Sequence, residues 1–270
     1  MTNLLLFFGD RSWLFALCVF MILCLRYVII SGGPYLLAWR VFNKKLSSRK
    51  IQAEKQRPLR IKAEIMWSLA SFAVFSIEAG IMHALFVRGH TRLVTSWDSL
   101  PAWENIADLF LLLVIHDAYF YWMHRILHHR HLFRFVHSVH HQSVNPTPFA
   151  AFAFHPVEAF LEMAFLIPII LWMPLYLGML LVFLILSHFF NVIGHLGYEF
   201  FPRSTWTSWW GSWNTTSTHH NLHHQHVSSN YGLYCKWWDK LCDTLNPKTE
   251  TEFFKIKDRL AAEKTEKDPS

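Results

Sequence analysis

Charged side chains are scarce in this chain: Asp, Glu, Lys and Arg make up 16% of its 270 residues, against about 25% in an average globular protein. Apolar residues reach 53% and aromatic residues 17%, and the apolar residues form long runs. This composition is typical of a chain that crosses a membrane rather than of a soluble domain. The sequence therefore predicts an all-α integral membrane protein.

Cysteine is also rare, and its four positions exclude two structural solutions. Cys18, Cys24, Cys235 and Cys242 have no CxxC spacing, so neither a disulfide framework nor a zinc ribbon is expected. Buried apolar thiols are the simpler expectation.

Three further features are missing from the sequence. The start of the chain has no basic n-region and no small-residue cleavage pattern, so its first apolar run is expected to be a retained span. No flavin or nicotinamide motif and no haem-binding domain is recognisable. Any redox chemistry would therefore need electrons from a separate protein.

The apolar runs predict four to five membrane spans, each needing about 20 residues. Three separate candidates are Trp13–Leu37, Met66–Val87 and Ile106–Trp122. The fourth region, Phe149–Ile193, is too long for one span and is interrupted by Pro168 and Pro174, so we expect a helical hairpin that turns near the sequence WMPLYLG.

The basic residues predict an orientation for these spans. Eight Lys or Arg residues lie between positions 43 and 64, and such loops stay on the cytoplasmic side of a membrane. This assignment accounts for the net charge of +6 without a nucleic-acid partner. Counting spans from there places His124–His141 and Thr218–His226 together on the cytoplasmic side, in the inner membrane of a bacterium or the endoplasmic reticulum of a eukaryote.

Histidine is abundant, with 18 residues, 15 of them between positions 116–141 and 188–226. Offsets of three and four place imidazoles on one helical face. Three such patterns supply eight imidazoles: His124 and His128; His137, His140 and His141; His220, His223 and His224. This number exceeds the four ligands of one tetrahedral zinc ion. The patterns predict two metal ions in a cap of helices.

Other histidines and two alternative functions complete this interpretation. His83, His90, His129 and His131 are expected to have no role in metal binding, and His116 and His188 stay ambiguous. A histidine patch that binds anionic lipid without metal would not explain the repeated spacing. A metal transporter would place its histidines along several spans, whereas most of these lie outside them.

One acidic residue, Asp117, lies within the third predicted span. It shares a helical stripe with Tyr121 and His124, and an ionisable residue inside a span is a functional candidate by default. Two roles stay open for Asp117: accepting the second ring N–H of a ligand histidine, or an interfacial capping role.

The three patterns, in this order, resemble the histidine boxes of the fatty acid hydroxylase and sterol desaturase superfamily, whose members are integral-membrane di-iron enzymes. The likeness covers roughly residues 107–245. The sequences NPTPFAAFAFHPVEAFLE and HHNLHHQHVSSNYGLYCKWWDKLCDTL are most similar to the sterol C5-desaturase (lathosterol oxidase) branch. WDKLCDT departs from the usual ending of that branch, which weakens the link to its exact sterol activity.

The resemblance implies a ninth ligand and a surrounding set of polar residues. His195, in NVIGHLGYEFFP, matches a ligand position of the family. Asn191 either reaches a metal through water or caps polar backbone, and His155 is expected to shape the site together with Glu158 rather than to bind metal. His219 and Asp239 complete the expected outer set.

The resemblance also implies an activity and its partners. Two iron ions, which zinc can replace in a purified sample, would use O2 and external electrons to oxidise an unactivated C–H bond of a sterol-like or fatty-acyl lipid. Desaturation is slightly favoured over hydroxylation, and no catalytic residue is expected beyond the metal centre. The donor would be a cytochrome b5, or a ferredoxin with its reductase. The expected organisation is N-terminal spans with a basic loop in 1–105, a catalytic domain in 106–247 and a charged tail in 248–270.

Overall fold

A computed structural model describes residues 2–53, 58–209 and 211–267 of the chain and is mostly helical. Four helical segments in this part are long and apolar enough to cross a membrane. They are Ser12–Val41, α3 (Pro58–Val87), α4 (Ala102–Leu127) and α9 (Leu177–Gly194). The prediction of an all-α, multi-pass integral membrane protein is confirmed.

The first span is one long segment made of three pieces. It starts as α2 (Ser12–Tyr27), widens into the π-helix η1 (Val28–Gly32), and continues into a second π-helix, η2 (Tyr35–Val41). The first three spans extend beyond the bounds predicted for them, because charged and polar turns at their ends stay helical after the apolar run has stopped. As a result, His124 lies on the last turns of α4 itself.

The predicted hairpin in Phe149–Ile193 forms, but only its second arm, α9, is a continuous candidate span. The first arm consists of α7 (Pro156–Ala164) and α8 (Leu166–Trp172). Pro168 accounts for the break, since it has no N–H to bond the carbonyl of Ala164, four residues earlier. The turn of the hairpin is β2 (Leu175–Tyr176), which pairs in parallel with β1 (Leu93–Val94) between α3 and α4.

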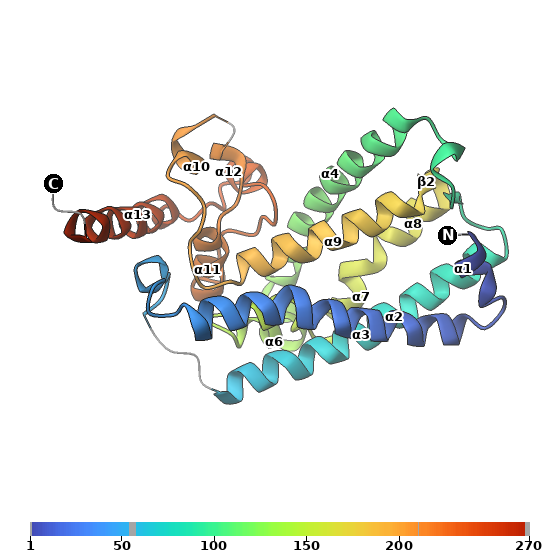
Figure 1. Cartoon of the computed structure of the whole chain (residues 1–270), viewed down its shortest axis with the longest axis horizontal. Helices are drawn as coiled ribbons and strands as arrows, with labels where there is room; N and C mark the ends of the chain where they lie inside the picture. The colour runs from blue at the N-terminus through green and yellow to red at the C-terminus, as the bar shows by residue number, and fades with distance from the viewer. Residues whose placement is uncertain (1, 54–57, 210, 268–270) are drawn as a thin grey trace.

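This pairing places the hairpin turn at the end of the bundle where α3 is connected to α4. Both histidine-rich regions gather at the opposite end, around which α10–α13 are also arranged (Figure 1). The predicted meeting of the two regions at one end of the spans is therefore correct.

The shorter elements are α1 (Thr2–Phe7), η3 (Ser47–Arg49), η4 (Trp97–Ser99), α5 (Arg130–Leu132), η5 (Phe133–His137), α6 (Ser138–His141), η6 (Pro148–Phe152), α10 (Ser204–Thr207), η7 (Gly211–Trp213), α11 (Ser217–Gln225), α12 (Trp237–Leu241) and α13 (Lys248–Lys267).

The charged C-terminal segment is a packed helix rather than a loose tail. In α13, Phe253 and Ile256 are buried, and the helix contacts both α11 and η3. The Arg259 side chain donates to the Ser48 carbonyl at 2.7 Å. The helix therefore links the loop after the first span to the histidine-bearing cap, while the three-part domain division stays a prediction. The four cysteines are free thiols and only half-buried.

Candidate metal centre

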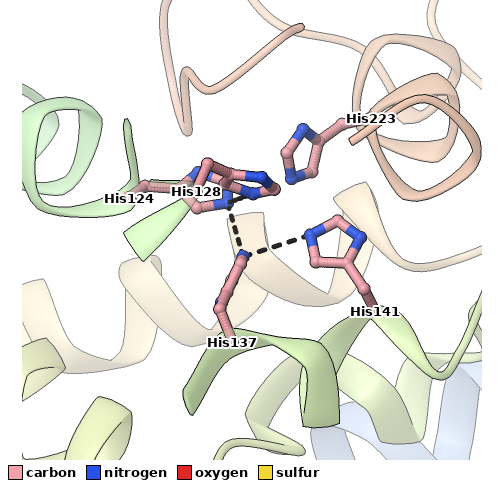
Figure 2. Close-up of side chains that lie close together, drawn as sticks. All are labelled: His124, His128, His137, His141 and His223. Atoms are coloured by element: carbon pink, nitrogen blue, oxygen red, sulfur yellow. Dashed lines mark hydrogen bonds between the residues drawn. The ribbon is translucent and has the colours of Figure 1, made fainter. Parts of the chain in front are cut away.

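The nine predicted ligands meet in two groups at the end of the bundle. One group contains five histidines, His124, His128, His137, His141 and His223, and the other contains four, His140, His195, His220 and His224. Within each group the candidate ligand atoms all lie within 4.8 Å of one another. Figure 2 shows the rings of the five-histidine group converging from separate segments of the chain.

The ring nitrogens are spaced as ligands of one ion would be. In the five-histidine group, His137 Nε2 lies 3.1 Å from both His124 Nε2 and His141 Nε2. In the four-histidine group, His195 Nε2 lies 3.0 Å from His220 Nε2 and 3.1 Å from His224 Nε2. Nitrogens bound at about 2.0–2.1 Å to one metal stand roughly 2.9–3.4 Å apart at octahedral or tetrahedral angles. The observed separations fit this range.

The two H-x-x-H-H patterns divide their histidines between the groups. His137 and His141 join the five-histidine group, whereas His140 joins the other. On α11 the split is reversed, since His220 and His224 go to the four-histidine group and His223 to the five-histidine group. Neighbouring residues on a helix point about 100° apart. Adjacent histidines therefore belong to different groups, which corrects the expectation that each pattern converges on one face.

The hydrogen bonds of the outward ring nitrogens, Nδ1, determine whether the inward nitrogens, Nε2, carry a proton or a lone pair. Nδ1 of His124 donates to the Tyr231 carbonyl at 2.9 Å and Nδ1 of His223 to the Ser229 carbonyl at 2.7 Å. Nδ1 of His195 donates to the Asn191 carbonyl at 2.8 Å. A neutral imidazole that donates from Nδ1 has only a lone pair on Nε2.

Lone pairs that converge on one point cannot form hydrogen bonds with one another, because none of them carries a proton. The Nε2 atom of His223 is buried and has no hydrogen-bond partner within the described residues. Two such sets of imidazole nitrogens fit iron, copper, zinc or nickel. A pair of transition-metal ions therefore fits the residues that are present.

Burial keeps these histidines neutral, which is the form that binds metal. Burial lowers the pKa of His195 to about 4. Burial and the surrounding imidazoles hold the pKa values of six others well below the usual range: His137, His140, His141, His220, His223 and His224.

Glu158 lies where the resemblance placed it, beside a candidate ligand. Its Oε1 accepts a hydrogen bond from His137 Nδ1 at 2.7 Å, and both side chains are buried. His155 is not in either group. Its Nδ1 accepts from the Val157 N–H at 3.2 Å and so caps α7, the helix that carries Glu158.

Asp117 binds a loop and not a histidine. Its Oδ1 accepts from the backbone N–H groups of Tyr234 and Cys235, and its Oδ2 from the Trp237 indole at 2.7 Å. Of the two roles considered for this residue, the direct bond to a ligand histidine is wrong. The carboxylate caps backbone, although it is buried in the protein.

Asp239 holds the adjacent part of the same loop. It accepts from the N–H groups of Tyr231 and Gly232 at 2.8 and 2.9 Å and from His219 Nε2 at 3.1 Å. Tyr231 supplies the carbonyl that orients His124. Asp239 therefore supports the candidate ligand His124 through the backbone, and His219 contacts this support through Asp239.

The contacts of Asn191 support the expectation that it caps polar backbone rather than reaching a metal through water. Its side-chain amide donates to the Ala151 carbonyl at 2.6 Å. Its own backbone carbonyl accepts from His195 Nδ1. The residue therefore helps to orient a ligand through its main chain.

Several contributors had no clear signal in the sequence. The carbonyls of Ser229 and Tyr231 are backbone atoms, which any residue could provide, although the Asn-Tyr-Gly sequence marks the turn. Asn230 there has a positive φ of 63°, which asparagine tolerates better than most residues. The ambiguous His188 pairs with Ser31, and His116 with the Tyr234 hydroxyl.

The histidines predicted to be bystanders lie outside both groups. His129 and His131 are exposed, and His83 bonds to Ser12 and to the Leu5 carbonyl near the other end of the bundle. His90 is exposed beyond the end of α3.

We predict that Glu158→Ala weakens metal binding by the five-histidine group about 10- to 100-fold, since His137 loses the acceptor that orients it. Competition with a chelator measures the affinity. Glu162→Ala is the matched control, because this residue is one turn along α7 and has no hydrogen bond to a histidine within the described chain. Equal losses in both variants, or none in Glu158→Ala, would contradict the role of Glu158.

We predict that metal binding is insensitive to pH until the solution is well below pH 6. An exposed histidine gains a proton near pH 6.5, whereas burial lowers the pKa of His195 to about 4. Protons compete with metal only as the pH falls through the folded-state pKa. Equilibrium dialysis from pH 7.5 to 4 should show a loss of metal only toward the acid end. A loss centred near pH 6.5 would mean that the ligands are solvated.

Comparisons with known proteins identify several relatives of this chain. Delta(7)-sterol 5(6)-desaturase ERG3B of Gibberella zeae is 28% identical over 79% of this chain and 62% of its own length. Lathosterol oxidase of Rattus norvegicus is 32% identical over 67% of this chain and 60% of its own. C-4 methylsterol oxidase erg25 of Schizosaccharomyces pombe is 27% identical over 96% of this chain and 82% of its own length.

The chain spans about three fifths of the length of the first two relatives. No solved structure matches it significantly. The family model for fatty acid hydroxylase matches residues 109–244, which contain all nine histidines of the two groups. The chain belongs to the fatty acid hydroxylase family.

Proposed function

We propose that this protein is a membrane-bound, O2-dependent di-iron oxidoreductase that desaturates or hydroxylates an unactivated C–H bond of a lipid. The observation that carries the proposal is the pair of all-histidine groups at the end of an apolar helical bundle. Iron bound at both groups would supply O2 activation, for which neutral nitrogen ligands are suitable.

The protein's own residues would provide geometry and a dry environment. Eight of the nine histidines are buried, and His128 is half-buried. Aromatic side chains lie against both groups: the ring centroid of Phe120 is 5.0 Å from that of His124, and Phe154 is 5.0 Å from His140. Such packing excludes water from the ligands and would allow hydrocarbon to approach the site.

The substrate class is inferred from the relatives. The relatives reported above are named for Delta(7)-sterols, lathosterol and methylsterols, so a sterol-like lipid is the first choice and a fatty-acyl lipid the alternative. Desaturation and hydroxylation begin with the same hydrogen abstraction, and the histidine geometry does not separate them. The sequence PTPF…FHP slightly favours desaturation.

The reaction would need electrons from a second protein. A cytochrome b5, or a ferredoxin with its reductase, is the proposed donor. The basic loop that starts at Lys44 leaves the first span at the end where the histidines gather, since its residues Lys50 and Ile51 pair with Tyr198 and Gly197 just after His195. The positive-inside rule would place this end, and hence the metal site, on the cytoplasmic side.

A metal transporter receives less support. Its histidines should line a path along the spans, whereas both convergent groups in the described chain lie at one end of the bundle. A transporter also has no need for a dry site walled by aromatic rings.

Product analysis tests the proposed function. Purified protein loaded with iron should consume O2 when it is given sterol or acyl lipid and a reduced donor. Mass spectrometry should then show one lipid changed by the loss of two hydrogens or by the gain of one oxygen. His137→Ala should abolish the change and His131→Ala should preserve it. Stoichiometric iron without O2 consumption or lipid oxidation would contradict the proposal.

A further inference from the structure

A cleft unrelated to the histidine groups lies between the ends of the first two spans. Its volume is about 480 Å³, within the roughly 300–1,000 Å³ range of small-molecule sites. Its walls come from η2 and from the first turns of α3, and Phe149 of η6 also lines it.

The mouth of the cleft carries two basic side chains. Arg40 lies near the end of the first span and Lys62 in the second turn of α3, and both are exposed. The Arg40 guanidinium lies over the Tyr35 ring, with its central carbon 5.9 Å from the ring centroid. Neither Arg40 nor Lys62 has an acidic partner among the residues that the structure describes. Among the described residues, the cleft therefore presents positive charge without an acidic partner.

The rest of the lining is apolar. Ile61, Ile65 and Met66 continue along α3 in the direction of the hydrocarbon core, while Tyr35 and Phe149 supply aromatic surface. Because η2 and α3 meet here at the ends of two adjacent candidate spans, the basic pair would lie at the depth of lipid headgroups. Positive charge at headgroup depth, above an apolar wall, complements an anionic amphiphile.

We propose that this cleft is a binding site for an anionic glycerophospholipid of the surrounding membrane. Its phosphate would lie between Arg40 and Lys62, and the start of an acyl chain would lie along Ile65 and Met66. Basic pockets between membrane helices recognise phosphate-bearing headgroups in this way. The site differs from the proposed catalytic centre and does not depend on the reaction assigned to it.

An occupant of the cleft would contact a segment that supports the metal site. The Phe149 carbonyl accepts from the Tyr27 hydroxyl at 2.7 Å and from Ser68 Oγ at 3.0 Å. From Phe149 the chain runs on to Phe154, whose ring packs against His140. Lipid binding should therefore stabilise the fold around the four-histidine group, and this effect is measurable without turnover.

The test is thermal unfolding of the full-length, metal-loaded protein in neutral detergent, titrated with lipid. Phosphatidylglycerol should raise the unfolding midpoint in a saturable manner, whereas phosphatidylcholine, oleate and inorganic phosphate should do so much less. Each basic side chain near a membrane surface contributes about fivefold in affinity. The double variant Arg40→Gln/Lys62→Gln should therefore bind phosphatidylglycerol about thirtyfold more weakly.

Two further variants distinguish the cleft from overall charge and from misfolding. Lys44→Gln/Arg88→Gln removes the same charge from exposed positions outside the cleft and should bind like the native protein. Ile61→Trp keeps every charge but fills the apolar wall, and it should also weaken binding. All variants should retain the native metal content.

Several results would overturn the proposal. One is an equal loss of phosphatidylglycerol affinity in the two double variants, since that would indicate that binding depends on the overall charge of the protein and not on the cleft. Another is unchanged binding in both Arg40→Gln/Lys62→Gln and Ile61→Trp. Stabilisation by phosphatidylcholine or oleate equal to that by phosphatidylglycerol would exclude recognition of an anionic phospholipid. An equal effect of inorganic phosphate would make the site one for free anions.

Discussion

The hydrogen bonds on the outer edges of the imidazoles are the interactions on which the rest of this structure depends. Each Nδ1 that donates to a carbonyl or carboxylate leaves an Nε2 lone pair directed inward. Several inward lone pairs at about 3 Å repel one another unless a cation lies among them. Metal binding at these groups would therefore be coupled to the stability of every segment that supplies an acceptor, from α7 to the loop before α12.

The membrane bundle and the cap have separate tasks in this arrangement. The spans bring distant segments of sequence to one end, because the hairpin of α7–α9 returns the chain to the side it left after α4. Two buried carboxylates, Asp117 and Asp239, then fix the loop that orients His124, although neither touches a candidate ligand. Rigid supports of this kind keep a ligand set in place where nearby side chains are mostly apolar.

Much of the fold and of the ligand set could be predicted from the sequence, because both depend on side-chain type and spacing. Apolar runs indicate spans, and histidines four apart indicate a shared helical side, whereas those three apart are divided between the two groups. The division of His140 from His141 could not be predicted, since it depends on where two helices stand relative to each other. Backbone acceptors such as the Tyr231 carbonyl leave no residue-type signal. The docking of α13 was missed because its few apolar residues, Phe253 among them, are dispersed among charges.

The most direct test of the two-group account is the iron content of anaerobically loaded, desalted protein and of one variant from each group. The native chain should retain two Fe(II) ions. His128→Ala and His224→Ala should each retain about one fewer, and X-ray absorption should show nitrogen ligation of the iron that remains. His129→Ala, next to His128 but outside both groups, should retain both ions. A native content of one ion or none, or full retention in both ligand variants, would contradict the account.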